Sequence, residues 1–259
     1  MGILNYTPDS FSDGGQYNSV NKAIGKIDQM LNDGADIIDI GAVSSRPGAK
    51  LLTSEQEIHR LKPLLCELNI NFKNALFSLD TYSSEVAEWA VNEYPISIIN
   101  DISAGNLDQN MFSTISKLQV PYIIMHMLGS PQTMQIKPTY KDITIEIIKD
   151  LAKKVSLLKQ LHVHDIIIDP GFGFGKTIEH NYQLLNEIVS FNIFDLPLLV
   201  GLSKKSMIQK VLNTNPENSQ NGTSILNAFA LTKGANIIRV HNVREAKEAV
   251  LLFQALSNN

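Results

Sequence analysis

Eight short apolar runs recur along this chain, and most of them end on or just before a polar or charged residue. The segments between the runs have the apolar spacing of amphipathic helices. Eight strands alternating with helices over about 250 residues form the sequence pattern of a (β/α)8 barrel. We therefore predict an α/β TIM barrel that forms a single domain over residues 1–259. The predicted strands are Gly2–Asn5, Asp36–Gly41, Leu76–Asp80, Ile96–Asp101, Tyr122–His126, Ile166–Asp169, Leu198–Gly201 and Ile237–His241.

This fold also locates a functional site, because barrels of this class place it at the carboxyl ends of the strands and in the loops that follow. The polar residues expected at this rim are Asn5, Asp80, Asn100, Asp101, His126, Asp169, Lys205, Arg239 and His241.

Two loops on the same face, Tyr6–Ser19 and Ala42–Thr53, exceed the usual connection length of about 2–6 residues. Their Gly, Ser and Pro content indicates lids that are mobile without ligand. The first helix is predicted from Val20 to Asp33, and Ser54 with Glu57 has the spacing of a capping box at the start of the second.

Composition narrows the function classes. A formal charge of −4 provides no basic surface for nucleic acid. Because Cys66 is the single cysteine, the chain cannot form an internal disulfide, as is typical of proteins of the reducing cytoplasm. We expect Cys66 to lie on a helix and its side chain to pack against neighbouring residues. We expect no membrane partner, since no stretch has the roughly 18 apolar residues that a span needs. Met1 leads directly into the first predicted strand, and we therefore expect the chain to be one module of a longer polypeptide.

One glycine-rich segment resembles a phosphate-binding loop but does not match it. Residues 171–177 read Gly-Phe-Gly-Phe-Gly-Lys-Thr, and Pro170 stands where that motif needs glycine. The glycines could let the backbone approach a planar ligand, with Phe172 or Phe174 against its face. A tight turn at the end of the strand is an equally good interpretation.

Three acidic residues, Asp80, Asp101 and Asp169, close apolar strands, and Asn100 precedes one of them. Each could be a helix N-cap. Their convergence on one barrel mouth instead favours a ligand edge rich in N–H donors, such as an aminopyrimidinone, since a carboxylate accepts two such bonds side by side.

The cationic residues after the last strands suggest an anion site. Lys205, Arg239 and His241 follow the seventh and eighth strands, where barrels often bind phosphate, and Arg46 joins them from the second loop. Arg239 could instead form a salt bridge in the barrel wall. Ser203 and Ser206 could be N-caps, and His126 a hydrogen-bonded core residue.

Taken together, these segments resemble the dihydropteroate synthases over essentially the whole chain. Tyr6, Ser45 and Lys204 depart from residues common in that family. The motifs that carry the resemblance are the opening Gly2–Gly15 segment, Ser44-Ser45-Arg46-Pro47-Gly48, Asp80-Thr81, Asn100-Asp101, Met125-His126-Met127, Asp169-Pro170-Gly171, Ser203-Lys204-Lys205-Ser206 and Arg239-Val240-His241.

The resemblance implies a role for each matching residue. The expected catalytic residues are Lys205, Arg239, His241, Asp80 and Asp169. The pterin would contact Asp80, Asn100, Met125, Asp169, Phe174, Gly201 and Lys205. The diphosphate would contact Asn5, Ser45, Arg239 and His241, with Mg²⁺ at Asn5. 4-Aminobenzoate would contact Phe11, Ser45, Arg46, Pro47, Lys205 and Ser206.

By the same resemblance, the reaction joins 6-hydroxymethyl-7,8-dihydropterin diphosphate to 4-aminobenzoate in folate synthesis. A homodimer, and fusion to or pairing with the pterin pyrophosphokinase, are further expectations. Three alternatives stay open: a pterin-binding methyltransferase barrel, a Schiff-base aldolase that uses Lys205, and a non-catalytic pterin-binding protein.

Overall fold

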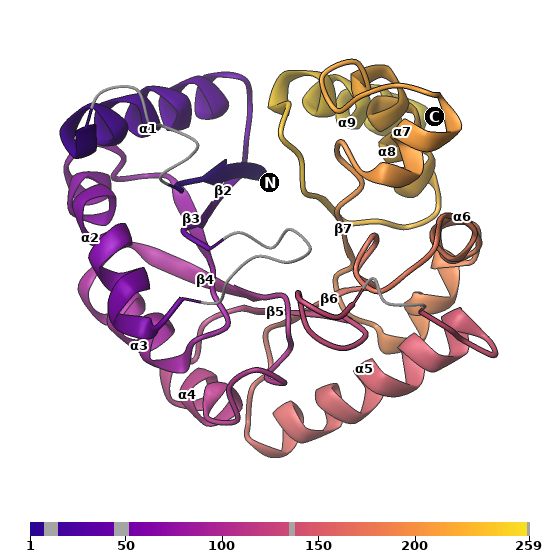
Figure 1. The fold of residues 1–259 in the computed structure, drawn as a ribbon, viewed down its shortest axis with the longest axis horizontal. Coiled ribbons are helices and arrows are strands. Elements are labelled where there is room, and N and C mark those ends of the chain that lie inside the picture. Colours follow the sequence, from indigo (N-terminus) through magenta and orange to yellow (C-terminus); the bar gives the residue numbers. More distant parts are fainter. Residues whose placement is uncertain (8–14, 44–51, 135–137, 258–259) are drawn as a thin grey trace.

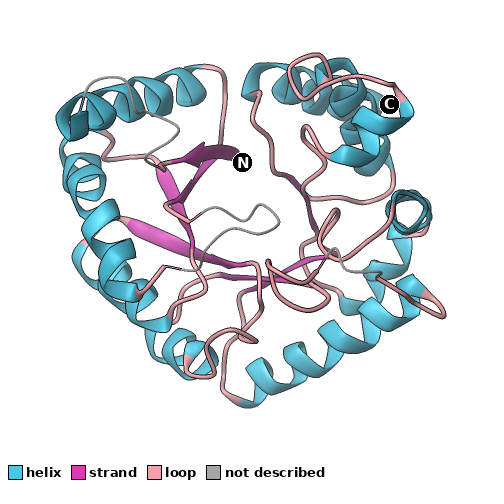
Figure 2. Cartoon of the chain, viewed as in Figure 1, coloured by secondary structure: helices cyan, strands magenta, loops and turns pink. Residues whose placement is uncertain are grey.

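The computed structural model describes residues 1–7, 15–43, 52–134 and 138–257. Its helices form an outer ring around the strands (Figure 1), with loops connecting the two layers (Figure 2). The strands are β1 (Gly2–Asn5), β2 (Ile37–Gly41), β3 (Leu76–Asp80), β4 (Ile96–Asp101), β5 (Tyr122–Met125), β6 (Ile166–Asp169), β7 (Leu199–Val200) and β8 (Ile237–Ile238).

The helices alternate with these strands, which confirms the predicted barrel class. They are α1 (Gly15–Asn32), α2 (Ser54–Asn71), α3 (Ser84–Glu93), α4 (Met111–Leu118), α5 (Ile143–Gln160), α6 (Ile178–Asn186), the 3-10 helix η2 (Ile188–Phe194), α7 (Ser206–Val211), α8 (Gln220–Thr232) and α9 (Val243–Ser257).

Two isolated bridges close the barrel. Strands β1 to β6 form a parallel sheet in sequence order, and β7 pairs with β8. The bridges Gly2↔Val240 and Ile168↔Leu198 join these two sheets at both seams. At the first seam the amide of Ile3 donates to the carbonyl of Val240 at 2.9 Å. The seam therefore places the end of β8 beside β1.

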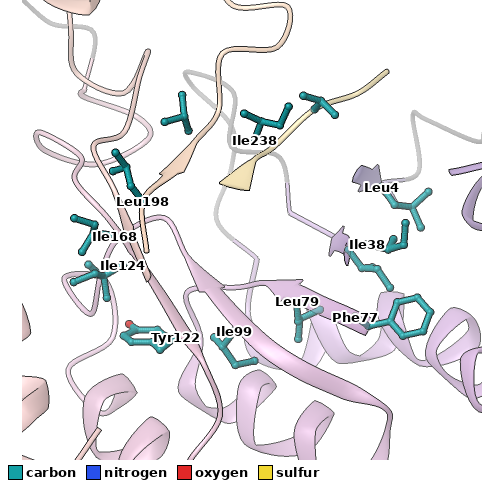
Figure 3. Close-up of a cluster of buried hydrophobic side chains, with 14 of the residues drawn as sticks. Leu4, Ile38, Phe77, Leu79, Ile99, Tyr122, Ile124, Ile168, Leu198 and Ile238 are labelled. Atoms are coloured by element: carbon teal, nitrogen blue, oxygen red, sulfur yellow. The ribbon is translucent and has the colours of Figure 1, made fainter. Parts of the chain in front are cut away.

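Side chains alternate along each strand, and the outward set forms the main core. In β2, Ile38 and Ile40 point outward and are fully buried under the helices, with their counterparts from the other strands shown in Figure 3. The inward set forms a separate apolar layer, Met1, Ile98, Ile123, Ile167 and Leu199, in the lower part of the lumen. The next inward position is polar in two of these strands, where Asn100 follows Ile98 and Asp169 follows Ile167.

The structure corrects several boundaries. Helix α1 begins at Gly15, earlier than the predicted Val20. The capping box of α2 is formed by Thr53 and Gln56, one residue before the predicted pair. The Thr53 hydroxyl accepts from the Gln56 amide at 3.3 Å, and the Gln56 side chain accepts from the Thr53 amide at 3.1 Å. Both residue types suit this motif, and the sequence alone did not decide between the two registers.

The expectations for Cys66 and for the last two strands were also wrong. The Cys66 side chain is exposed and does not pack in the core, because it lies on the outer face of α2, where it contacts the Tyr94 hydroxyl at 3.7 Å. Strands β7 and β8 span two residues each and stop before Gly201 and His241. None of the described helices is both long and apolar enough to cross a membrane.

The shift in the cap register leaves Glu57 in a buried position. Its side chain is fully buried, and neither carboxylate oxygen reaches hydrogen-bond geometry with a partner. Burial raises the pKa of Glu57 to about 7, although the nearby Thr81 hydroxyl opposes the shift. Because the pKa is raised on folding, Glu57 favours the folded state below its unfolded value of 4.5, and this contribution is lost as the pH rises through about 7.

We expect Glu57→Gln to gain stability over the wild type as pH rises, because the variant has no buried carboxyl to ionise. The difference in unfolding free energy should grow by on the order of 2 kcal/mol between pH 5 and pH 8, as measured by urea denaturation. Glu88→Gln on the exposed face of α3 is the matched control and should show no such trend. A constant difference across this range would mean that Glu57 does not titrate there.

Candidate active site

Charged residues of both signs occupy the inward positions above the apolar layer. They lie at the carboxyl ends of the strands because β2, β4 and β6 each place an inward polar residue two positions after an inward apolar one, and β3 ends on the inward residue Asp80. Asp39, Asp80, Asn100, Asp169 and Arg239 come from five different strands or strand ends. The barrel thus gathers at one mouth residues that are far apart in the sequence.

Arg239 is the centre of one group. Its Nε donates to Asp39 at 2.6 Å and its terminal nitrogen donates to Asp80 at 2.9 Å. Burial alone would lower the pKa of Arg239, but the two carboxylates outweigh it and raise the pKa above its usual value. Burial also raises the pKa of Asp80, with Arg239 opposing that shift. Arg239 therefore forms the wall salt bridge that the sequence left open, while its guanidinium still borders the mouth.

Asp39 is a site residue that the sequence analysis missed. It is fully buried, and one of its oxygens accepts from both Arg239 and the Asn100 amide, the latter at 3.0 Å. Its other oxygen is buried without a hydrogen-bonding partner. The signal was present, since Asp39 interrupts the otherwise apolar run Ile37–Ile40. A charged residue in the middle of a buried strand requires a partner.

Lys205 and Asp169 form the second group. Lys205 precedes α7, and its ammonium donates to the carbonyl of Phe172 and lies 4.9 Å from the centre of the Phe174 ring. Burial lowers the pKa of Lys205 to about 8, while Asp169 opposes the shift. Burial raises the pKa of Asp169 and Lys205 opposes that change, so each group is the other's counter-charge.

The walls around Lys205 are apolar and close. A Cβ at Gly201 would lie 3.9 Å from the Lys205 ammonium and 4.0 Å from the Cβ of Arg239, so this glycine borders both residues. Met125 is buried in a cluster with two other methionines, against which Phe174 packs. Phe172 belongs to the main core, which leaves Phe174 as the aromatic ring beside Lys205.

His241 and Asn5 belong to the two chain segments that meet at the barrel seam. The His241 ring nitrogen Nδ1 lies 3.0 Å from the Ser203 hydroxyl, which also accepts from the His241 amide. Asn5 ends β1 with an exposed side chain, next to the chain that leaves β8. Ser203 thus orients His241 and is not the helix cap. Ser206 is the exposed first residue of α7, and Lys205 holds the cap position without a side-chain bond.

Asp101 is excluded from the ligand-binding group. Strand alternation turns it outward where Asn100 turns inward, and its carboxylate accepts from the Tyr122 hydroxyl and from the amides of Ser103 and Gly105, all within 2.8 Å. Asp101 therefore stabilises the turn after β4. It neither faces a ligand nor caps a helix N-terminus. The spacing placed it at the rim but could not tell which side of the strand it faces.

His126 is a core residue. Burial lowers its pKa to about 2, with the nearby Lys176 contributing in the same direction. Lys176, a second residue that the sequence analysis did not select, reaches His126 Nδ1 at 3.1 Å.

The described residues contain no group of three or more His, Cys, Asp or Glu that could hold a metal ion. Four residues expected at the site, Phe11, Ser45, Arg46 and Pro47, lie outside the described residues.

Comparison with known proteins decides the family. The family model described as "Pterin binding enzyme" matches residues 1–241. Dihydropteroate synthase of Escherichia coli is 40% identical over 98% of this chain and 90% of its own length. The chain belongs to the pterin-binding enzymes and, within them, to the dihydropteroate synthase family.

Two further relatives extend the comparison. The Yersinia pestis dihydropteroate synthase, solved as a sulfonamide drug complex, has a TM-score of 0.93 and 37% identity over 100% of this chain and 94% of that one. A folate synthesis bifunctional protein of Arabidopsis thaliana is 40% identical over 99% of this chain, which covers 56% of that protein. Members of this synthase family therefore exist both as separate chains and as parts of larger ones.

We expect Asp169→Asn to weaken pterin binding by on the order of 2–4 kcal/mol, because an acceptor pair that we expect to meet ligand N–H groups becomes half donor. Calorimetry with 6-hydroxymethylpterin measures the effect. The asparagine oxygen can still accept from the Gly171 amide, which Asp169 binds at 2.7 Å, so the loop is retained. Asp165→Asn, before the same strand and exposed, is the control. Unchanged affinity in Asp169→Asn would remove this residue from the pterin site.

Proposed function

We propose that this chain condenses 6-hydroxymethyl-7,8-dihydropterin diphosphate with 4-aminobenzoate, giving 7,8-dihydropteroate and diphosphate. The observation that supports it best is that two chemically opposite parts of a ligand site, acceptors and cations, lie together at the barrel mouth. Asp80, Asn100 and Asp169 offer acceptors to a ring edge rich in N–H groups. Arg239 and His241 face the side where a leaving diphosphate needs cations. A pterin bearing a diphosphate matches both parts at once.

The proposed chemistry is a dissociative substitution at the pterin methylene. Its bond to the diphosphate oxygen breaks with the electron pair going to diphosphate, and the cationic side of the site stabilises that charge. The remaining cation is delocalised into the ring, where Asp80 and Asp169 favour it. The amine of 4-aminobenzoate is a free base at neutral pH, so it attacks the methylene without a strong general base and then loses a proton to water.

We propose that Mg²⁺ assists at Asn5. The exposed carboxamide at the end of β1 fits this ion, which commonly takes few protein ligands and completes its shell with water and substrate phosphates. When bound, the ion would neutralise part of the diphosphate charge. His241, oriented by Ser203, would contact the diphosphate from the neighbouring strand end.

The 4-aminobenzoate site is proposed beside Lys205 and Ser206, with Phe11, Ser45, Arg46 and Pro47 from the two long loops completing it. Lys205 supports the placement because it directly precedes α7 and its ammonium interacts electrostatically with Asp169. A cation there can also attract the carboxylate of the aminobenzoate.

The assembly and location are likewise proposed. We infer a homodimer that forms through α7, α8 and α9, which carry a group of exposed large apolar side chains. Sedimentation velocity would measure whether the protein is a monomer or a dimer in solution. We also propose a cytoplasmic location, which the exposed, unpaired Cys66 fits, and a functional link to the pterin pyrophosphokinase. The apolar side chains in question are Val211, Leu212, Ile225, Phe229, Leu251, Leu252 and Leu256.

The deciding experiment measures diphosphate release from the dihydropterin diphosphate with and without 4-aminobenzoate. We expect release that depends on both Mg²⁺ and 4-aminobenzoate, together with formation of dihydropteroate. Binding of both substrates without turnover would support a non-catalytic pterin-binding protein instead. Borohydride trapping of a Lys205 adduct would support the aldolase alternative.

We expect Arg239→Ala to lower kcat/KM by about 10²-fold or more, because it removes a cation from the leaving group. Affinity for 6-hydroxymethylpterin, which lacks the diphosphate, should fall far less. Urea denaturation of the variant separates this effect from the loss of stability caused by leaving Asp39 and Asp80 without their cation. Arg244→Ala, an exposed arginine at the start of α9, is the control. Equal losses for turnover and for pterin binding would make Arg239 a wall residue.

A further inference from the structure

Lys176 is a buried lysine that contacts His126, the residue just after β5. It follows the glycine-rich loop 171–175, which the sequence analysis compared with a phosphate-binding loop. Its side-chain nitrogen lies 2.8 Å from the Gly171 carbonyl, 3.0 Å from the Phe174 carbonyl and 3.1 Å from His126 Nδ1. A fourth acceptor, the His126 carbonyl, lies farther away at 3.4 Å, so the three shorter contacts can use the three N–H donors of an ammonium group.

His126 is suited to this contact because its ring is neutral. With its pKa near 2, the ring keeps one nitrogen free to accept a hydrogen bond at neutral pH. The loop also packs tightly on His126, since a Cβ at Gly171 would lie 1.9 Å from the His126 carbonyl. Lys176 therefore holds the loop against the end of β5.

Two further backbone groups of the loop are hydrogen-bonded by neighbouring side chains. Asn181 accepts from the Gly173 amide at 2.7 Å, and the Tyr140 hydroxyl donates to the Gly175 carbonyl at 2.8 Å. The Phe172 carbonyl is different, because it points toward the site and accepts from Lys205. Phe174, from the same loop, places its ring beside the same ammonium.

We propose that Lys176 is a positioning residue for the reaction: by binding the carbonyls of Gly171 and Phe174, it fixes the loop in the form that presents the Phe172 carbonyl and the Phe174 ring to Lys205. It touches neither substrate. The proposal rests on the proposed function, because it assigns Lys205 to pterin binding, but it adds a residue to which the resemblance gives no role.

Charge alone gives a competing explanation, since several charged groups surround Lys176. Asp169, Lys205 and Asp150 influence its pKa, and burial lowers that pKa well below its usual value. Lys154, on α5, is also buried near His126, but it pairs with Asp150 at 3.0 Å. Lys154→Met is therefore a matched control that removes a neighbouring buried cation and leaves the loop contacts in place.

The test is a double-mutant cycle on 6-hydroxymethylpterin affinity, measured by calorimetry. Lys176→Met should weaken binding by about 10- to 100-fold, as expected when a binding group is displaced by roughly 1 Å. In a Lys205→Ala background the same change should cost less than about threefold, because the group on which it acts is gone. Lys154→Met should have little effect in either background.

A second measurement reads Lys205 directly in the ligand-free protein. The rate of acetic anhydride labelling is measured at several pH values by peptide mass spectrometry. In the wild type it should give a pKa of about 8 for Lys205. In Lys176→Met we expect a higher value, because a released loop lets water reach the ammonium. An unchanged labelling profile, or an equal loss of pterin affinity in both backgrounds, would overturn the proposal.

Circular dichroism and urea denaturation establish that each variant is folded. Should Lys176→Met fail to fold, Tyr140→Phe replaces it in the cycle, since it removes a single hydrogen bond from the same loop. It should produce a smaller loss that also depends on Lys205, and an equal loss in both backgrounds would contradict the mechanism. Wild-type turnover tests the proposed function separately, so the two hypotheses can fail independently.

Discussion

The organisation of the site depends on placing opposite charges in one buried layer of the lumen. Below this layer the barrel is filled by apolar side chains, among them Ile98, Ile123 and Ile167. Above it, Arg239 lies between Asp39 and Asp80, and Lys205 lies near Asp169. Each ion would be costly to bury alone, and the pairs remove most of that cost. Removing Arg239 would leave two carboxylates without their cation, and removing Lys205 or Asp169 would leave the other without its counter-charge, which makes the layer interdependent.

The repeating pattern of apolar runs was sufficient to predict the barrel and the ends of most strands. It succeeded because parallel strands are buried on both faces and read as continuous apolar segments. It also brought Asp80, Asn100 and Asp169 to one mouth, since strands that alternate with helices point their carboxyl ends the same way. The short final strands were less predictable, because β7 and β8 pair over two residues each.

The errors have a common physical origin, which is that residue type does not reveal which neighbour a side chain meets. Asn100 and Asp101 are adjacent and both polar, yet alternation sends one into the lumen and the other toward Tyr122. Asp39 and Lys176 are partners of other residues, and their importance shows only when Arg239 and the glycine-rich loop are in place. Contacts between distant segments decide these roles.

The same burial acts in opposite directions on the two kinds of charge. It lowers the pKa of Lys205 and raises the pKa of Asp169, so without ligand each group depends on the other to keep its charge. A ligand that brings N–H donors to Asp169 and negative charge to the cations would relieve both shifts at once. A pterin ring with an anionic substituent has this combination, whereas a ring alone would serve the carboxylates and leave the cations without a partner. The electrostatics of the barrel mouth thus favour a ligand with both N–H donors and negative charge.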